Sequence, residues 1–403
     1  MDVAGKRLLI IGAGRGQVGL YKAAKEMGIH TIAGTLPDNN PPGIALADEV
    51  CYMDIANVED VVDKAKKLNL DGVATCCLDT GIPALGAVCD KLGLVGLSSE
   101  AARICGDKLS MKKKFIDNDV STAKFYKVSS QMELEKALSD LSMPVIIKAT
   151  DLQGSNGIYI ANTREEALYG YKGAMEKTKR EFCIVEEFIE GWEFGAQAFV
   201  SEGEVLFVMP HGDETFMSHT AVPVGHYVPL KCEQKILEQT IETVKGAIKA
   251  IGLNNCAVNV DLIERNGKVY VIELTGRVGA NCLPELVEIN YGIEYYKMIA
   301  LAALGGNPRD LWNLRNEVES AGLAKMILET EKAGLLKEIS LEGPVSNNVV
   351  EVTFFKKKGD MIRVFENSND CIGQVIVRGE TLEQCEKTMK STLEKVSMTL
   401  SES

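Results

Sequence analysis

The chain begins with short apolar runs that alternate with segments of helical spacing. Residues 8–12, 30–33, 49–53 and 72–75 have the apolar character of buried strands, and the intervening segments place apolar residues on one helical face. Strands that alternate with helices in this way form a parallel sheet that helices cover on both sides. The first hundred residues are therefore predicted to form a Rossmann-like domain.

After residue 122 the strands follow one another more closely. The strands predicted in this part are 143–148, 158–161, 181–189, 194–201 and 205–209. Residues 211–229 have no regular period and are predicted to form a long loop, a type of connection that usually serves as a lid or a binding loop. His211, His219 and His226 lie in it, and we assign them no chemistry.

The last hundred residues begin after a boundary at Gly305-Gly-Asn-Pro-Arg, which precedes an α+β pattern. Strands are expected at 322–328, 349–355 and 372–377. Residues 381–400 have the spacing of a long amphipathic helix, which is expected to end the fold.

Residues 259–281 carry two β-rich runs joined by a turn, with Asp261 before the turn and Glu273 after it. Side chains alternate along a strand, so the loop length decides whether the two acids share a face. A two-residue turn at Asn266-Gly267 would separate them, whereas a three-residue loop from Arg265 to Gly267 places both on one face. Two carboxylates that share a face repel each other unless a cation lies between them, and Mg²⁺ or Mn²⁺ fits this role. Two solvated acids on a surface hairpin are the alternative.

Composition and charge exclude several classes of protein. The net charge of -13 argues against a nucleic-acid partner, and no apolar run reaches membrane-spanning length. Eleven cysteines without repeated short spacings indicate reduced thiols and a cytoplasmic protein. If the ligand is a nucleotide, individual lysines, arginines and metal ions must attract its phosphates into an acidic protein.

A glycine-rich turn follows the first strand. Gly14, Gly16 and Gly19 meet the Gly-x-Gly-x-x-Gly pattern of dinucleotide sites, but two residues later than such a site prefers. No acid directly follows the second strand to hold a ribose. A structural turn and a ligand site, including the NAD site of an oxidoreductase, both stay open.

The hairpin resembles the metal-binding hairpin of the ATP-grasp superfamily, whose members join a carboxylate to an amine through an acyl phosphate. In that family a strand acid and a later Glu-x-Asn-x-Arg hold Mg²⁺ and steady the reacting oxygens. Asp261, Glu273 and Arg277 fall on this pattern. The resemblance implies that the two acids bind metal and that Arg277 is catalytic. Thr275 stands where the family usually has a metal-binding Asn.

Two lysine motifs also follow the family order. Gly-Asp-Lys108 resembles the first ATP lysine, and the run Lys112-Lys-Lys114 after it is predicted to be a solvated helix face. Lys148 ends a strand and resembles the second ATP lysine. The glycine-containing loop 149–157 resembles the family's mobile ATP-covering loop, because its backbone N–H groups can approach phosphates closely. The residues implied for ATP here are Lys108, Lys148, Gly154, Ser155 and Gly157.

The segment 181–193 resembles the adenine-binding linker of the family. Glu186 would accept from the adenine amino group, and the backbone of Glu187 and Ile189 would pair with the ring edge. Phe188 would lie against the core, and Glu193 would bind the ribose hydroxyls. A strand edge offers the donor and acceptor spacing that a purine needs.

The resemblance covers nearly the whole chain and implies an α/β ATP-grasp fold in four parts. These are a Rossmann-like pre-ATP-grasp domain (1–107), a small lid subdomain with the adenine linker (108–195), a core with the metal hairpin (196–310) and a C-terminal α+β subdomain (311–403).

Chain length and a single copy of the fold are most similar to amino-acid ligases. They imply an ATP-dependent ligase that joins a carboxylate, an amino acid, to an amine through an acyl phosphate. Its partners would be these small molecules, with neither nucleic acid nor membrane, and homodimerisation stays open. A bicarbonate-using carboxylase of the biotin-carboxylase type and a non-catalytic ATP sensor or scaffold are the alternatives.

Overall fold

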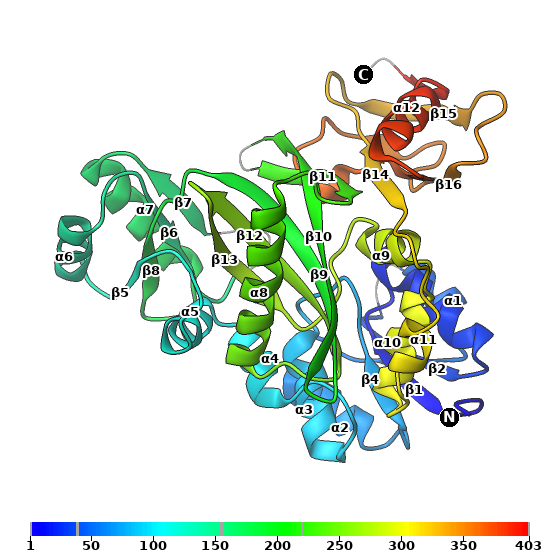
Figure 1. Ribbon diagram of the computed structural model, residues 1–403, viewed down its shortest axis with the longest axis horizontal. Coiled ribbons are helices and arrows are strands. Elements are labelled where there is room, and N and C mark those ends of the chain that lie inside the picture. Colours follow the sequence, from blue (N-terminus) through cyan, green and yellow to red (C-terminus); the bar gives the residue numbers. More distant parts are fainter. Residues whose placement is uncertain (1, 38–39, 153–156, 219–220, 402–403) are drawn as a thin grey trace.

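The computed structural model describes residues 2–37, 40–152, 157–218 and 221–401, which form four β-sheets with helices packed around them (Figure 1). The first sheet is parallel, in the order β3-β2-β1-β4. Its strands are β1 (Arg7–Ile11), β2 (His30–Thr35), β3 (Glu49–Tyr52) and β4 (Gly72–Ala74). Its helices are α1 (Val18–Glu26), α2 (Val58–Ala65), α3 (Ile82–Leu92) and α4 (Ser99–Cys105), with 3-10 turns at Arg15–Gln17 and Pro42–Ala45.

The predicted covering of this sheet on both faces is confirmed by its central strand. Leu9 and Ile11 of β1 belong to one hydrophobic core, and Leu8 and Ile10 belong to another. Successive side chains of a strand point to opposite faces, so β1 contributes to both cores. A strand buried on both faces is apolar throughout, which explains the unbroken run in the sequence.

The glycines after β1 make close packing contacts. A Cβ on Gly16 would lie 2.7 Å from the Cβ of Cys77, and one on Gly19 would overlap the ring of Tyr296 on α10 (Tyr295–Ala303). Gly19 thereby lets α1 pack directly on α10. Packing therefore accounts for two of the three fingerprint glycines, as the structural interpretation of this turn expects.

A small antiparallel sheet in the order β5-β8-β6-β7 stands apart at the left of Figure 1. Its strands are β5 (Phe125–Val128), β6 (Val145–Lys148), β7 (Ile158–Ala161) and β8 (Cys183–Glu187). Helices α6 (Gln131–Asp140) and α7 (Arg164–Lys177) share a separate hydrophobic core with it, and α5 (Lys108–Asp117) precedes it.

The largest sheet has eight strands in the order β13-β12-β9-β10-β11-β14-β18-β16. These are β9 (Trp192–Ser201), β10 (Glu204–Met217), β11 (Ala221–Val228), β12 (Cys256–Arg265), β13 (Lys268–Thr275), β14 (Ala321–Ile327), β16 (Val349–Phe354) and β18 (Gly373–Gly379). Helix α8 (Gln234–Ile251) packs on β10 and β13. Helices α9 (Leu283–Tyr291) and α11 (Arg309–Trp312) lie before β14 in the chain.

The predicted loop at 211–229 is wrong, because the described residues of this stretch lie mostly on β10 and β11. His211, Asp213 and His226 occupy one face of these paired strands, which are polar there rather than apolar. A strand that faces a polar site lacks the hydrophobic alternation on which the prediction depended. His219 lies outside the described residues.

A three-stranded sheet in the order β17-β15-β19 completes the chain, with β15 (Gly334–Leu341), β17 (Met361–Ile362) and β19 (Val396–Leu400). A 3-10 turn at Ser368–Asp370 precedes β18. The predicted helix 381–400 is wrong at its end, since α12 (Leu382–Leu393) stops before β19, which pairs with β15. β14 joins the eight-stranded sheet beyond the expected boundary at residue 310, and the four-part division stays a prediction.

The turn of the β12–β13 hairpin has two residues, so the predicted three-residue loop is wrong. Arg265 pairs with Lys268, and Asn266 and Gly267 have φ of 55° and 79°, as a tight hairpin turn requires. The register shifts between Asp261 and Leu262, which leaves Ile272 unpaired and sets Asp261 opposite Glu273. A β-bulge thus places the two acids on one face, as the three-residue loop was expected to do.

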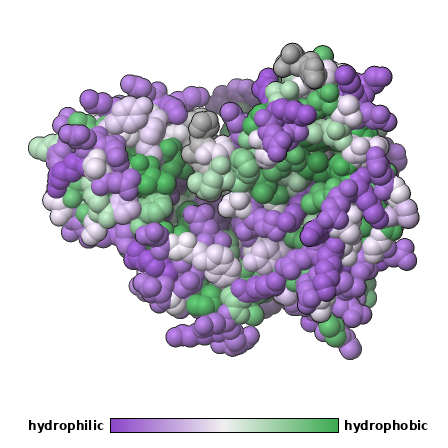
Figure 2. Space-filling view, turned by 90° about the horizontal axis from the view of Figure 1, so that it is seen from above, coloured by the Kyte–Doolittle hydropathy of each residue, from purple (hydrophilic) through white to green (hydrophobic). Residues whose placement is uncertain are grey.

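The surface seen from above is mostly hydrophilic, with apolar residues gathered across the middle of this face (Figure 2). Among the helices of the described ranges, none has the length and apolar character needed to span a membrane.

Gly19→Ala should lower the free energy of unfolding by about 1–3 kcal/mol, because the added methyl group cannot fit against Tyr296. Gly246→Ala in α8 is the matched control, since its nearest neighbour would be Val120 Cγ2 at 3.6 Å. That substitution should stabilise the protein by about 0.5–1 kcal/mol through helix propensity. Urea unfolding measures both, and equal stabilities of the two variants would contradict the packing role of Gly19.

Candidate active site

One face of the large sheet carries polar side chains in a row across four strands. Glu273 pairs with Asp261, Asp261 with Gly195, and Gly195 with His211. Residues directly opposite each other in a sheet project to the same face. The face that carries the hairpin acids therefore continues to His211, with the missing side chain of Gly195 leaving room for the imidazole ring.

The two hairpin acids lie together, as the metal interpretation requires. The protein around Asp261 shields it from water, and this desolvation together with the nearby charge of Glu273 raises its pKa to about 6. The residue as a whole is nevertheless exposed on the surface of the sheet. Asn259 donates to Asp261 Oδ1 at 3.1 Å. Glu273 Oε1 is 3.0 Å from Lys108 Nζ. The two carboxylates repel each other and together attract a cation. Lys108, the predicted ATP lysine, provides one positive charge.

The predicted metal ligand Thr275 follows Glu273 on this face. Thr275 pairs with Asn259 and is 8% exposed. Its hydroxyl can offer one neutral oxygen, which is a weaker ligand for a hard cation than a carboxylate. Asp261, Glu273 and Thr275 share this face, and each carries an oxygen atom of the kind that Mg²⁺ prefers.

Lys148 and Glu186 form a buried charge cluster with a residue that the sequence placed wrongly. Lys148 Nζ and Lys112 Nζ lie 3.2 and 3.1 Å from the same oxygen, Glu186 Oε2. Lys112 is 2% exposed, so the predicted solvated face is wrong for this residue, while Lys113 and Lys114 are exposed. Three successive lysines look alike in the sequence, but successive helical positions point in different directions and only Lys112 lies on the buried side of α5.

The cluster holds opposite charges together away from water. Burial alone would raise the pKa of Glu186, but the two ammonium groups outweigh it and hold it below its usual value. Burial lowers the pKa of Lys112 despite Glu186. Glu186 Oε1 has no partner among the described residues. One acceptor oxygen and an excess of one positive charge are thus available to a ligand.

The linker after Glu186 contains the backbone groups that the resemblance assigned to the adenine edge. The N–H of Glu187 and that of Phe188 bond to the carbonyls of Lys124 and Pro144, whereas the N–H of Ile189 has no hydrogen bond to a described residue. Phe188 is half-buried, and Glu187 Oε1 accepts from Arg265 at 2.8 Å. A small apolar cluster flanks this backbone: Ile189, Ala123, Ile263, Tyr270 and Ile272. Ile272, the bulge residue, therefore faces this cluster.

Glu193 and the glycine loop complete the predicted nucleotide residues. Glu193 is exposed and pairs with Ile263, two residues from Asp261. It therefore lies on the same sheet face as Asp261 and Glu273. Gly157 has φ of 71°, and its carbonyl accepts from Ala149 at 3.0 Å. Gly154 and Ser155 lie outside the described residues.

The predicted catalytic residue Arg277 is held by an acid that the sequence did not reveal. Arg277 Nε and Nη2 lie 2.7 and 2.5 Å from the two carboxylate oxygens of Asp79, in the loop after β4. Burial raises the pKa of Asp79, but Arg277 outweighs it and holds the pKa below its usual value. Ligand residues often follow the carboxyl ends of parallel strands, and that signal could have identified Asp79.

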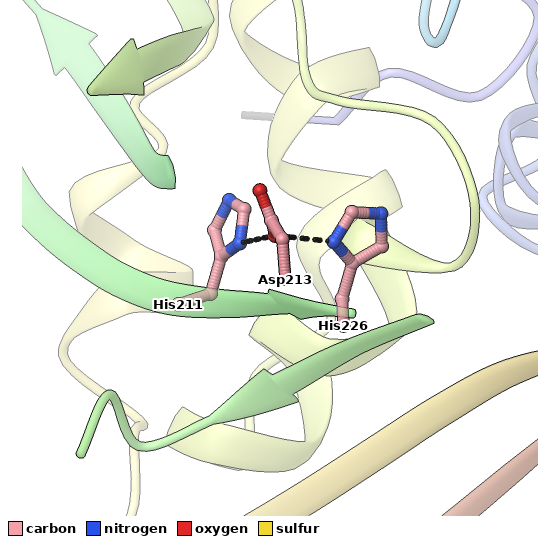
Figure 3. A group of neighbouring side chains, drawn as sticks. All are labelled: His211, Asp213 and His226. Carbon is pink, nitrogen blue, oxygen red and sulfur yellow. Dashed lines mark hydrogen bonds and ion pairs between the residues drawn. The ribbon is translucent and has the colours of Figure 1, made fainter. Parts of the chain in front are cut away.

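Three polar side chains beside this row form a second cluster that the sequence did not predict. Asp213 Oδ1 lies 2.9 Å from His211 Nδ1 and 2.6 Å from His226 Nδ1 (Figure 3). Gln197 connects His211 to Asn259, with its Nε2 3.1 and 2.7 Å from the ring nitrogen and the amide oxygen. A hydrogen-bonded path therefore leads from the histidines to Asp261.

Two family models match the chain. Residues 141–285 match the ATP-grasp domain, and residues 326–401 match the L-amino acid ligase C-terminal domain 2. The solved structure of phosphoribosylglycinamide synthetase from Anaerococcus prevotii is similar to this chain at 60% identity and a TM-score of 0.89, covering 98% of this chain and 100% of that one. The chain belongs to the ATP-grasp family.

More distant relatives have the same architecture. L-amino acid ligase from Bacillus licheniformis has a TM-score of 0.81 at 18% identity, over 99% of this chain and 100% of that one. Carbamoyl phosphate synthase large chain from Clostridium beijerinckii is 24% identical over 371 residues, which is 86% of this chain but 34% of that protein. This ATP-grasp chain thus spans about a third of that curated relative. The predicted fold and the class of ATP-dependent carboxylate–amine ligases are confirmed, which leaves the oxidoreductase alternative without support.

Glu186→Gln should destabilise the ATP-grasp chain by about 3–5 kcal/mol, because it leaves two buried lysines without a counter-charge. Glu187→Gln, one residue along, removes a carboxylate from a half-exposed pair and should change stability by less than about 1 kcal/mol. Urea unfolding compares the two. Similar losses would show that the buried cluster carries no special weight.

Asp261→Asn should stabilise the metal-free protein increasingly as the pH rises from about 3.8 to about 6, and by a constant amount above that, since a carboxyl whose folded pKa is raised loses its stabilising contribution over the range between its unfolded and folded pKa values. Thermal melts with a chelator measure the effect. Asp63→Asn, in an exposed helical pair, is the control and should show no such trend. A pH-independent difference would contradict the raised pKa.

Proposed function

We propose that this ATP-grasp enzyme joins the carboxylate of an amino acid to an amine, with ATP converted to ADP and phosphate. The observation that carries the proposal is the arrangement of Asp261, Glu273 and Arg277. The two acids share one sheet face, and Arg277 follows them in the chain with its guanidinium fixed. Such a site can hold a metal-bound phosphate beside a carboxylate.

The nucleotide would occupy the space between the small sheet and the large one. Lys108 and Lys148 would approach its phosphates, the linker at Glu187 to Ile189 would meet the adenine edge, and Glu193 would meet the ribose. Glu186 Oε1 and the N–H of Ile189, which have no hydrogen bond to a described residue, are an acceptor and a donor that a purine edge can satisfy. Gly154, Ser155 and Gly157 belong to the loop proposed to cover the phosphates.

Mg²⁺ would be held by Asp261 and Glu273, with Thr275 as a third oxygen donor. The donor set is all oxygen, and the pKa of Asp261 is raised by burial and by the charge of Glu273, so a divalent ion would favour its ionised form. When bound, the ion would neutralise the charge that develops on the transferred phosphoryl group. Lys108 already meets this demand in part through its 3.0 Å contact with Glu273.

Arg277 and Asp79 support an amino acid as the carboxylate substrate. Their guanidinium and carboxylate lie side by side, which matches the opposite charges of an amino-acid zwitterion. Arg277 would bind the substrate carboxylate, activated as an acyl phosphate, and then stabilise the oxyanion that forms when the amine attacks. The relative with 60% identity is a phosphoribosylglycinamide synthetase, a name that describes an amide of glycine, so glycine belongs among the first substrates to test.

Arg277→Lys should reduce ligation about 10²- to 10³-fold while ATP still binds, because a lysine cannot hold a carboxylate through two parallel hydrogen bonds. The assay follows phosphate release and amide formation with ATP, Mg²⁺ and panels of amino acids and amines, glycine and phosphoribosylated amines included. Arg265→Lys, which alters the contact with Glu187, is the matched control and should retain most activity.

The same assay separates the alternatives. Phosphate release stimulated by bicarbonate but by no amino acid would replace the proposal with a carboxylase-type ligase. Tight ATP binding without stimulated phosphate release from any mixture would replace it with an ATP sensor.

A further inference from the structure

The cluster of His211, Asp213 and His226 lies on β10 and β11, on the sheet face that carries Asp261 and Glu273, and has no part in the function proposed above. His211 and His226 are 2% and 4% exposed, and their ring centroids lie 5.3 Å apart with an angle of 84° between the ring planes. Figure 3 shows all three side chains on the same side of β10 and β11, with the carboxylate between the rings. One carboxylate oxygen therefore serves both imidazoles.

The protonation of His211 follows from the hydrogen bonds of Gln197. The N–H of Gly279 donates to Gln197 Oε1 at 2.8 Å, so the other end of the amide is the NH₂ group. This group faces both Asn259 Oδ1 and His211 Nε2. His211 must accept at Nε2 and donate from Nδ1 to Asp213, which makes it a neutral, fixed ring.

This arrangement argues against a metal ion at the cluster. A cation bound by the Nδ1 atoms would require His211 to carry its proton on Nε2, where a metal-bound histidine donates to an acceptor. Gln197 presents a donor at that position, held there by Gly279. The three residues offer metal-ligating atoms within 4.8 Å of one another, but their surroundings favour hydrogen bonds to Asp213.

His226 differs from His211 in its second nitrogen. Its Nδ1 is 2.6 Å from Asp213 Oδ1, and its Nε2 has no hydrogen-bond partner among the described residues. A carboxylate that accepts from Nδ1 leaves the lone pair of the ring on Nε2 and stabilises the imidazolium that forms when Nε2 takes a proton. The pair therefore has the arrangement of a histidine base oriented by an acid.

We propose that His226, oriented by Asp213, takes the proton from the ammonium group of the amine substrate before it attacks the acyl phosphate. The inference rests on the proposed function, since an amine is an ammonium ion near neutral pH and has no lone pair until it loses a proton. Of the two imidazoles in this cluster, only His226 has a ring nitrogen without a hydrogen bond to a described residue, since Gln197 donates to His211 Nε2. His211 is a positioning residue that fixes Asp213.

The position of the cluster agrees with this role. Asp213 lies two residues beyond His211 on β10 and pairs with His226, so the row from Glu273 and Asp261 continues to β11 on the same face. A Cβ on Gly195 would overlap the ring of His211, so the absence of a side chain there leaves the space that the ring occupies.

The step conserves protons and electrons. The ammonium N–H bond breaks, and its proton binds His226 Nε2. The freed nitrogen lone pair forms the bond to the acyl carbon, and the C–O bond to phosphate breaks when the tetrahedral intermediate collapses. The second amine proton leaves with the phosphate, and His226 returns its proton to solvent.

Hydroxylamine gives a selective test, because it is mostly unprotonated at neutral pH and traps acyl phosphates without a base. His226→Gln should lose amide formation about 10²- to 10⁴-fold, with hydroxamate formation within about threefold of the unchanged enzyme. Asp213→Asn should show the same selective loss, and it carries the test if His226→Gln does not fold. His30→Gln, at a histidine on β2 in the first sheet, is the control and should leave both reactions unchanged.

Two outcomes would overturn the inference. Equal loss of hydroxamate and amide in a folded variant, checked by an ATP-induced thermal shift, would place the cluster in nucleotide or carboxylate binding. Retention of both hydroxamate and amide formation would show that the cluster takes no part in the reaction. Failure of the unchanged enzyme to form hydroxamate from any carboxylate would instead contradict the proposed function, so the two failures are distinguishable.

Discussion

The repulsion between Asp261 and Glu273 is the constraint on which the site depends. The backbone holds the two acids opposite each other, and the response of the chain is to supply cations. Lys108 Nζ lies 3.0 Å from Glu273 Oε1. The same pattern recurs at the other cationic residues, where Lys148 is paired with Glu186 and Arg277 is paired with Asp79.

Internal pairing of this kind lets an acidic protein keep its cations in place without ligand. A buried lysine or arginine with no counter-charge would be costly, so each is held by a carboxylate until an anion replaces or shares it. ATP and a substrate carboxylate would therefore exchange partners with residues already in position, which limits the rearrangement on binding. The net charge of -13 is compatible with phosphate binding because local pairing, rather than the overall field, governs the site.

The sequence predicted the local motifs better than the contacts between distant segments. The strand-ending Lys148 and the two acidic hairpin strands lie where their patterns indicated, because each pattern reflects a short stretch of backbone. The bulge at Ile272, the inward turn of Lys112 and the Asp79 contact of Arg277 depend on packing between segments far apart in the chain. No periodicity within a single segment records such contacts.

The bulge also explains why Asp261 and Glu273 share a face although the predicted loop length was wrong. A two-residue turn without a bulge would set Asp261 opposite Ile272 and send Glu273 to the other side of the sheet. The extra residue places Ile272 with the apolar cluster beside Ile189 and returns Glu273 to the side of Asp261. One irregular position thus lets two successive side chains project to one face, Ile272 toward the proposed adenine region and Glu273 toward the proposed metal region. A regular ladder would have to give up one of these contacts, and bulges often redirect side chains beside functional sites in this way.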